Sequence, residues 1–407
     1  MKKLLYGSLA ITFFVASLNV NAQTEDADPR STRGGNLSKA KPTPAGKQSK
    51  EISDNGKSAE FLVQYSIPAT PVKNQAQTGT CWSFSTTSLV ESQLLKNNIG
   101  NFDLSEIYTV RNIYLEKATN YIMRQGNARF SEGALGHDQI RAFEKYGAIP
   151  ENVYDGMTVD QEMHNHTDLV KNLKSYLDTL LAHRPVPANW REGFTRILDK
   201  SLGTPPESFM YNNKKYTPQT FAKEVLKFNA NDYVNITSFR HKPYYSSFIL
   251  DVPDNFSNGE YYNVPLNEMM DIIKTSISKG YSVMWDADVS NPGFNAKTGL
   301  ALFTGTTGSS FARTSSVDGQ ELPVSDTMRQ RLFETLVTED DHLMHIVGIE
   351  KAKEGGKTFF NVKNSWGNVG PYNGYIKVSE AYMAMNTISL IVPRAALSPV
   401  LLNKLKK

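Results

Sequence analysis

A single cysteine, Cys81, is the feature that most constrains what this chain of 407 residues can form. One thiol excludes an internal disulfide, a cysteine-rich zinc site and an iron–sulfur cluster. Cys81 is therefore either an inert buried thiol or a reactive one, and the residue alone leaves both interpretations open. The sequence predicts no metal site and no cofactor.

The first 22 residues have the pattern of a secretory signal peptide. Lys2 and Lys3 precede a short apolar run over 9–16, and Val20-Asn21-Ala22 supplies a small-residue cleavage site. The run is too short to span a bilayer, and no later run of about 18 apolar residues occurs. We therefore expect export, to the periplasm or the medium, and no integral membrane segment. Removing the two lysines lowers the net charge from +3 to +1, which predicts no nucleic-acid partner.

Residues 23–58 are predicted to form a disordered leader. They contain no aromatic side chain and are dominated by Pro, Ser, Gly and Lys. Such a segment cannot bury enough apolar surface to offset the entropy lost on ordering. The sequence leaves open whether this leader is a tether or a removable pro-segment, and its composition favours the tether.

The rest of the chain places helices first and strands last. Helical spacing of apolar residues occurs over 81–97, 104–122, 136–146, 169–181, 218–228 and 266–279. Short β-rich runs occur over 281–289, 343–349, 358–364, 375–378 and 387–392. These patterns predict an α+β fold with a helical lobe over 59–155, a helical insertion over 156–280 and a β-rich lobe over 281–407.

Cys81 lies at the predicted start of the helix over 81–97, directly after a polar loop. The unsatisfied N–H groups and the macrodipole at a helix N-terminus favour a negative charge. A free thiol with a pKa of about 8.5 is only a few per cent ionised at neutral pH, and a nearby histidinium together with a helix N-terminus can lower that pKa by several units. The position therefore favours a reactive thiol.

The chain resembles the papain-like cysteine peptidases in four motifs that occur in the same order as in that family. They are Gln75, Cys81-Trp82, Asp341-His342 and Asn364-Ser365-Trp366. The resemblance implies a papain-like fold, with the Cys81 helix in the N-terminal lobe and an antiparallel, barrel-like β lobe after the insertion. It implies that Cys81 forms an acyl-enzyme, that His342 as imidazolium stabilises the thiolate, and that Asn364 orients the imidazole. Gln75 and the backbone N–H of Cys81 are the implied oxyanion donors.

His345 is the alternative base, because it enters the same predicted strand as His342. Positions three apart on a strand face opposite sides, so only one of the two can face the thiolate. The resemblance favours His342, since Gly348 follows it at the spacing that the family shows. Trp366 either shields the bond between the histidine and Asn364 from water or packs in the core.

The segment 131–135 resembles the glycine-containing segment with which these peptidases pair a substrate backbone like an added strand. Gly133 and Ala134 are the predicted substrate-binding residues in it, together with Trp366. Ala134 stands where the family has its second glycine, so its methyl group is expected to narrow the cleft.

Two departures from papain-type enzymes indicate a branch of the family. In papain-type enzymes the histidine follows the cysteine by about 130–150 residues, whereas His342 follows Cys81 at a much larger separation. Thr78 also stands where those enzymes have a further cysteine. Both features resemble the bleomycin hydrolase and aminopeptidase C branch. This resemblance implies a cysteine aminopeptidase that acts on peptides, a homo-hexamer, and a C-terminal tail in the cleft whose carboxylate holds the substrate's α-amine.

The end of the chain leaves the type of cleavage open. Few residues follow Arg394, and the last two are Lys406 and Lys407, whose charge would repel an α-ammonium. An endopeptidase or a dipeptidyl-type cut therefore remains an alternative to an aminopeptidase. A catalytically silent peptide-binding protein of the same fold is a further alternative. A transglutaminase-like acyl transferase is a last alternative, but Gln75 and the Asn364-Ser365-Trp366 motif fit a papain-like peptidase better.

Overall fold

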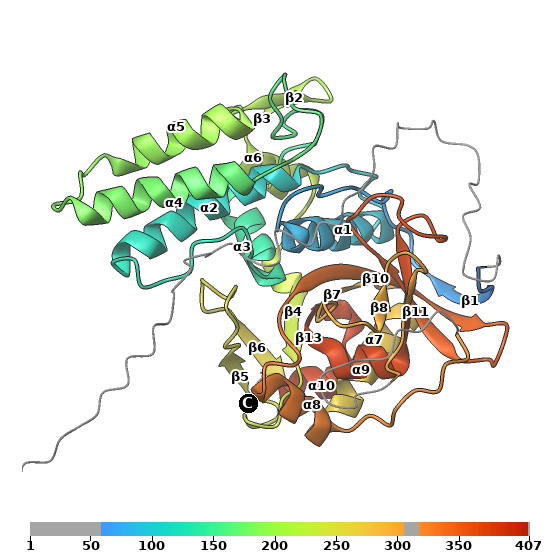
Figure 1. Cartoon of the computed structure of the whole chain (residues 1–407). Helices are drawn as coiled ribbons and strands as arrows, with labels where there is room; N and C mark the ends of the chain where they lie inside the picture. Colours follow the sequence, from blue (N-terminus) through green and yellow to red (C-terminus); the bar gives the residue numbers. More distant parts are fainter. Residues whose placement is uncertain (1–57, 305–316, 406–407) are drawn as a thin grey trace, which may run out of the picture.

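The computed structural model of this protein describes residues 58–304 and 317–405. The predicted signal peptide (1–22) and the predicted leader (23–58), except for Ser58, lie outside the described residues. A mainly helical part lies against one side of a large sheet, and further helices pack on the other side (Figure 1). Within the described ranges, none of the helices combines the length and the apolar character needed to cross a membrane.

Helices form most of the first half of the described chain. In chain order they are α1 (Cys81–Lys96), α2 (Glu106–Met123), α3 (Gly136–Tyr146), α4 (Thr167–Ala182), α5 (Trp190–Leu202), α6 (Pro218–Thr220), η1 (Phe221–Val225), η2 (Ala230–Asp232), α7 (Leu266–Ser278), α8 (Asp326–Glu334), α9 (Glu380–Asn386), η3 (Arg394–Ala396) and α10 (Pro399–Lys404). The helices predicted over 81–97, 104–122 and 136–146 are present as α1, α2 and α3. Ser105 caps α2, since its Oγ accepts a hydrogen bond from the Tyr108 N–H at 3.1 Å.

Strands form one large sheet and a small hairpin. They are β1 (Phe61–Ser66), β2 (Phe209–Tyr211), β3 (Lys214–Tyr216), β4 (Tyr233–Thr237), β5 (Ser247–Ile249), β6 (Glu260–Asn263), β7 (Val283–Ala287), β8 (Phe294–Asn295), β9 (Leu300–Ala301), β10 (His342–Ala352), β11 (Thr358–Lys363), β12 (Tyr375–Ser379) and β13 (Thr387–Pro393). The large sheet has the order β5-β6-β4-β13-β7-β10-β11-β12-β9-β8, and β1 also pairs with β10. The hairpin consists of β2 and β3.

The large sheet differs from the predicted antiparallel, barrel-like lobe in two ways. It is open, because its order ends at β5 on one side and at β8 on the other. It also contains two parallel pairs, β4 with β6 and β9 with β12. Parallel strands need a long crossover connection, which strand patterns alone do not reveal. The central strands β13, β7, β10 and β11 pair antiparallel, as predicted.

The central strands separate two hydrophobic clusters, because alternate residues of a strand point to opposite faces. Met284, Leu343 and Ile391 belong to the first cluster, which also contains side chains of α1 to α5. Trp285 and Met344 belong to the second cluster, which contains side chains of α7 and α9. The sheet therefore has one face toward α1 and the other toward α7.

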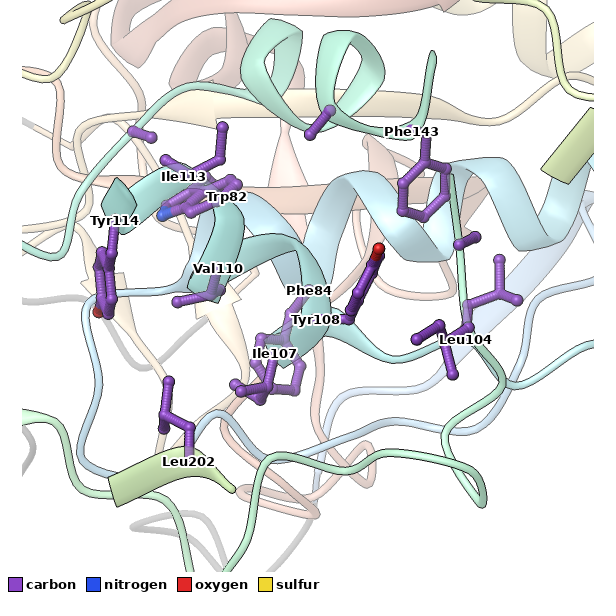
Figure 2. Close-up of a cluster of buried hydrophobic side chains, with 14 of the residues drawn as sticks. Trp82, Phe84, Leu104, Ile107, Tyr108, Val110, Ile113, Tyr114, Phe143 and Leu202 are labelled. Atoms are coloured by element: carbon purple, nitrogen blue, oxygen red, sulfur yellow. The ribbon is translucent and has the colours of Figure 1, made fainter. Parts of the chain in front are cut away.

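Helix α1 runs through the first cluster rather than along the surface. Figure 2 shows Trp82 and Phe84 of α1 among buried side chains that include Ile113 of α2 and Phe143 of α3. A helix that is covered on most of its faces has little freedom to shift, since protein cores are close-packed. This packing fixes the position of its first residue, Cys81.

The middle of the chain, predicted as a helical insertion over 156–280, is helical only in part. Helices α4 and α5 pack into the first cluster through residues such as Leu173 and Phe194. Residues 233–263 instead contain β4, β5 and β6, which extend the large sheet. Val234 and Ile236 of β4 are buried and alternate with partly exposed neighbours, but a run this short does not distinguish a strand from a helix segment.

The C-terminal helix α10 lies on the α7 side of the sheet. Leu401 and Leu405 belong to the second cluster, and Lys404 Nζ lies 3.5 Å from Glu268 Oε1 of α7. Cys81 belongs to the first cluster, on the opposite face. Residues 399–405 are therefore separated from Cys81 by the sheet, unlike the cleft-filling tail that the resemblance implies.

Candidate active site

Cys81 is the first residue of α1, at the point where the loop 73–80 meets the helix. Thr80 precedes it as the N-cap residue and makes no side-chain cap hydrogen bond. The N–H groups of a first helical turn have no acceptor within the helix. The Cys81 side chain is 8% exposed, so the thiol lies at the border of the core. The helix thus places a thiol and backbone donors at one end of α1.

His342 begins β10 and contacts two residues of the Asn364-Ser365-Trp366 motif. Its Nε2 lies 2.7 Å from Asn364 Oδ1, which also accepts a hydrogen bond from the Ser365 N–H at 2.8 Å. The Trp366 ring stacks on the imidazole with a centroid separation of 4.6 Å and an interplanar angle of 28°. The amide oxygen and the indole together fix the orientation of the His342 ring.

His345 has different partners from His342. Its Nδ1 lies 2.9 Å from Ser88 Oγ of α1, and the side chain is buried. Among the described residues, it forms no hydrogen bond with Asn364 and no ring stack with Trp366. The structure therefore pairs His342 with the asparagine and uses His345 to join β10 to α1.

Gln75 bridges the Cys81 loop and the Asn364 motif. Its Nε2 donates to the Thr78 carbonyl at 2.6 Å, and its Oε1 accepts from Ser365 Oγ at 2.6 Å. Its backbone N–H donates to the Ser365 carbonyl at 2.8 Å. These three bonds hold the Gln75 amide in one position between two segments that are far apart in the sequence.

Burial favours the neutral forms of both Cys81 and His342. It raises the pKa of the Cys81 thiol to about 12, although a backbone hydrogen bond from Leu343 favours the thiolate. It lowers the pKa of His342 to about 4, although the bond to Asn364 favours the imidazolium. Within the described part of the chain, no hydrogen bond joins the sulfur to the imidazole. Burial thus opposes ionisation of both groups, whereas the Leu343 and Asn364 hydrogen bonds favour it.

Three carboxylates near Cys81 were not identified from the sequence: Asp254, Asp286 and Asp340. Each of them repels the thiolate and so contributes to the raised pKa of Cys81. Asp286 of β7 lies opposite Leu343 of β10, and opposite residues of an antiparallel pair have their side chains on the same face. No motif marks these residues, because they come from three segments outside the four matched motifs.

Glu132 connects the predicted substrate-binding segment to the nucleophile loop. Its Oε2 accepts from the Gly79 N–H at 2.6 Å, and its carbonyl accepts from Trp82 Nε1 at 3.1 Å. Gly133 follows directly and is partly exposed. Ala134 is buried in the first cluster, so its methyl group packs in the core. The structure therefore brings Gly133 beside the start of α1 and turns the Ala134 side chain inward.

A buried polar cluster joins α1 to the sheet behind Asn364. Lys363 Nζ donates to Ser88 Oγ at 2.7 Å and to Thr70 Oγ1 at 3.1 Å. Thr70 Oγ1 in turn donates to Glu91 Oε2 at 2.5 Å. We call these four residues and His345 the Lys363 cluster. Because Lys363 immediately precedes Asn364, this cluster sets the position of the asparagine relative to α1.

The site contains the groups that acyl transfer requires, namely a thiol, an oriented imidazole and fixed amide donors. Among the described residues, no group of three or more His, Cys, Asp or Glu side chains is arranged to hold a metal ion. The chemistry that these residues can perform is attack by sulfur on a carbonyl carbon.

Two family models match this sequence. The model of the Peptidase C1-like family matches residues 137–407, and that of the papain family of cysteine proteases matches residues 62–112. The first range contains His342 and Asn364, and the second contains Gln75 and Cys81. The two matches therefore cover all four sequence motifs.

Known proteins resemble most of the chain. Aminopeptidase C of Lactococcus lactis subsp. cremoris is 25% identical over 390 residues, which cover 84% of this chain and 85% of the relative. Bleomycin hydrolase of Rattus norvegicus is 23% identical over 389 residues, with 83% of each chain covered. The crystal structure of PepW from Lactobacillus rhamnosis HN001 has a TM-score of 0.64 at 21% identity, with 84% of each chain covered, and so shares the fold.

Proposed function

The chain belongs to the Peptidase C1-like family and is a cysteine peptidase of the aminopeptidase C and bleomycin hydrolase type, and we propose that it cleaves peptide bonds with Cys81 as the nucleophile. The observation that supports this most directly is the 2.7 Å contact between His342 Nε2 and Asn364 Oδ1. This contact leaves Nδ1 of the same ring to accept the thiol proton. We propose that His342 is the general base and that Asn364 is its orienting partner.

In the proposed reaction both groups start neutral. As Sγ of Cys81 bonds to the carbonyl carbon, its proton passes to Nδ1 of His342. The imidazolium then gives this proton to the leaving nitrogen as the C–N bond breaks, which yields a free amine and a thioester. A water molecule, deprotonated by the neutral imidazole, attacks the thioester and releases the acid and the thiol.

Gln75 and the N-terminus of α1 are the proposed oxyanion donors. One N–H of the Gln75 amide binds the Thr78 carbonyl, and an amide nitrogen carries a second N–H. The backbone N–H of Cys81 lies in the first helical turn and completes the pair. Removing one such donor in other hydrolases lowers the rate by about 10²–10³-fold.

The proposed substrates are peptides with a free N-terminus, as the names of the relatives aminopeptidase C and aminopeptidase G indicate for those proteins. Two further properties belong to the proposal. Residues 1–22 are proposed to direct export, which predicts a mature chain that begins at Gln23. The chain is proposed to form a homo-hexamer, which sedimentation of the purified protein would measure.

A thiol-directed epoxide inhibitor tests the assignment of the nucleophile. It should label Cys81 in the folded protein, and Cys81→Ala should show no label. Mass spectrometry of the labelled peptide identifies the site. Absence of labelling in folded protein would support a silent peptide-binding protein in place of an enzyme.

A pair of peptides tests the type of cleavage. One peptide has a free N-terminus, and the other has the same sequence with an acetylated N-terminus. An aminopeptidase should cleave the free peptide much faster. Equal rates for both would reject the aminopeptidase and favour an endopeptidase of the same fold.

A further inference from the structure

The loop 250–259, which joins β5 to β6, reaches from the sheet to the helical part of the molecule, and we call it the strap (Figure 1). Asn120 Nδ2 of α2 donates to the Phe256 carbonyl at 2.9 Å. Ser257 Oγ lies 2.8 Å from Nε2 of His137 in α3. Two helices on one side of the first cluster therefore hold a loop that belongs to the sheet.

Aromatic and glycine contacts hold the strap in place. The Phe256 ring packs against the first cluster, with Lys117 Nζ 5.6 Å and Arg141 Cζ 5.9 Å from its centroid. A Cβ atom on Gly259 would lie 2.2 Å from His137 Nε2, so only glycine permits this approach. Close packing, as well as hydrogen bonds, therefore holds the strap in its position.

The strap places the Asp254 carboxylate directly against Gly133. A Cβ atom on Gly133 would lie 2.0 Å from Asp254 Oδ2, so the missing side chain makes room for the carboxylate. The other oxygen, Oδ1, lies 3.7 Å from Arg129 Nε. Asp254 is 6% exposed, although the residue next to it, Pro253, is exposed. The repulsion between Asp254 and the Cys81 thiolate agrees with this position beside the nucleophile.

The two sides of Cys81 have different roles in the proposed reaction. His342 must protonate the leaving amine, so the C-terminal part of a substrate departs over His342 and Trp366. The N-terminal part then extends toward the other neighbours of the nucleophile loop. Glu132, which bonds Gly79 and Trp82, marks that side. Gly133 and Asp254 follow immediately beyond it.

From this arrangement we propose that Asp254 binds the α-ammonium group of the peptide substrate and that the strap limits how many residues precede the cleaved bond. The inference rests on the proposed peptidase function. A carboxylate that accepts N–H bonds from an ammonium group forms a charge-assisted hydrogen bond, which is shorter and stronger than a neutral one.

The test compares Asp254→Asn with the wild-type chain on three peptides that differ only at the N-terminus. The first has a free N-terminus, the second is acetylated, and the third is acetylated with lysine as its first residue. The variant should lose about 10- to 100-fold in kcat/KM on the free peptide, the range expected for a hydrogen bond to a charged group. Its kcat/KM on the acetylated peptide should not show this loss, so the ratio of the free to the acetylated rate should fall about 10- to 100-fold; any change in Cys81 reactivity caused by the lost charge acts equally on both peptides and leaves the ratio unaffected.

Two variants serve as controls for this test. Asp251→Asn alters an exposed carboxylate of the same strap and should keep the wild-type preference. Arg129→Gln removes the cation beside Oδ1 and should raise the preference for the free peptide, which gives a second measurement if Asp254→Asn does not fold. Labelling of Cys81 checks that each variant retains a reactive site.

The outcomes separate this inference from the function on which it rests. A wild-type chain that cleaves none of the peptides would reject the proposed function itself. Cleavage with an unchanged free-to-acetylated ratio in Asp254→Asn would reject the inference alone. An equal loss on both peptides would assign Asp254 a purely structural role, and rapid cleavage of the acetylated lysine peptide would indicate recognition of a side chain instead.

Discussion

His342 and His345 lie three residues apart on β10 and have separate partners, Asn364 and Ser88. His342→Ala should lower kcat by about 10³-fold or more, because it removes the general base and acid. His345→Ala should keep most of the turnover but lower the free energy of unfolding by about 1–3 kcal/mol, because a buried hydrogen bond to Ser88 is lost. Steady-state kinetics and urea denaturation of both variants measure the two effects.

The reverse pattern would assign the base to His345. A loss of turnover in both variants with equal destabilisation would indicate that the packing of β10, rather than the chemistry of one ring, limits the rate. Far-UV circular dichroism of each variant at 25 °C would detect loss of the fold.

His166 gives the chain a pH dependence of stability outside the active site, and its sign is the same as that of His342, whose pKa burial also lowers. The ring is buried, with Nδ1 3.0 Å from Tyr114 Oη, and burial lowers its pKa to about 3. The unfolded chain binds a proton there near pH 6.5, whereas the folded chain does not until far lower pH. The contribution of the neutral His166 ring to the free energy of unfolding is therefore fully present above pH 6.5. It is lost progressively as the pH falls toward 3.

The comparison with His166→Gln isolates this contribution, because glutamine does not titrate. The difference in unfolding free energy between the wild type and the variant should shrink by about 1.4 kcal/mol for each pH unit below about 6. Urea denaturation at pH 7, 6 and 5 measures it. A difference that stays constant over this range would mean that His166 is protonated in the folded state.

The candidate site could be predicted from the sequence where its residues form local motifs. Gln75, Cys81, His342 and Asn364 were identified because each belongs to a short pattern in a fixed order, and the structure joins three of them through Ser365 and the imidazole contact. Asp254 could not be identified, because a loop far along the chain brings it to Gly133. Such proximity depends on tertiary structure alone.

The Lys363 cluster links α1 to the neighbouring strands β10 and β11. Lys363→Met should lower the free energy of unfolding by about 2–4 kcal/mol, because Ser88 and Thr70 lose a donor and the buried Glu91 keeps only Lys73 of the two cations that stabilise its charge. The double variant Lys363→Met/Glu91→Gln should cost less than the sum of the single variants. Urea denaturation of the three variants measures this coupling.

A matched control for this prediction is Lys145→Met on α3. Lys145 pairs with Glu116 at 2.8 Å but is 57% exposed, so its loss should change the unfolding free energy by less than about 1 kcal/mol. Additive effects of Lys363→Met and Glu91→Gln would show that these two residues act independently.

The first helices and the last strands were predicted, whereas the middle of the chain was not. Helices α1 to α3 each have several turns of apolar spacing, and α3 begins and ends at the predicted residues. Strands β4 and β6 have five and four residues and were missed, as was the helix α5. The parallel pairing of β4 with β6 further depends on an order of strands that the sequence does not display.

The whole molecule should unfold as one unit, because α4 and α5 share the first cluster with α1 and the sheet. Phe194 of α5 is fully buried there. Phe194→Ala should lower the free energy of unfolding by about 3–5 kcal/mol and should preserve a single transition. Differential scanning calorimetry measures both properties.

Arg196→Ala is the control, since Arg196 lies on the same helix and is exposed. It should change the unfolding free energy by less than about 0.5 kcal/mol. Two separate transitions in the Phe194 variant would show that the segment with α4 and α5 is an independent domain.

The stacking of Trp366 on His342 gives the protein an optical reporter of its own. Of the four tryptophans in the sequence, Trp82, Trp190 and Trp285 are buried, whereas Trp366 is partly exposed and has its ring 4.6 Å from the imidazole. An imidazolium ion quenches the emission of an adjacent indole more strongly than a neutral ring does. The intensity at the red edge of the emission band therefore follows the protonation of His342, and stopped-flow fluorescence can time the arrival of that proton without a dye.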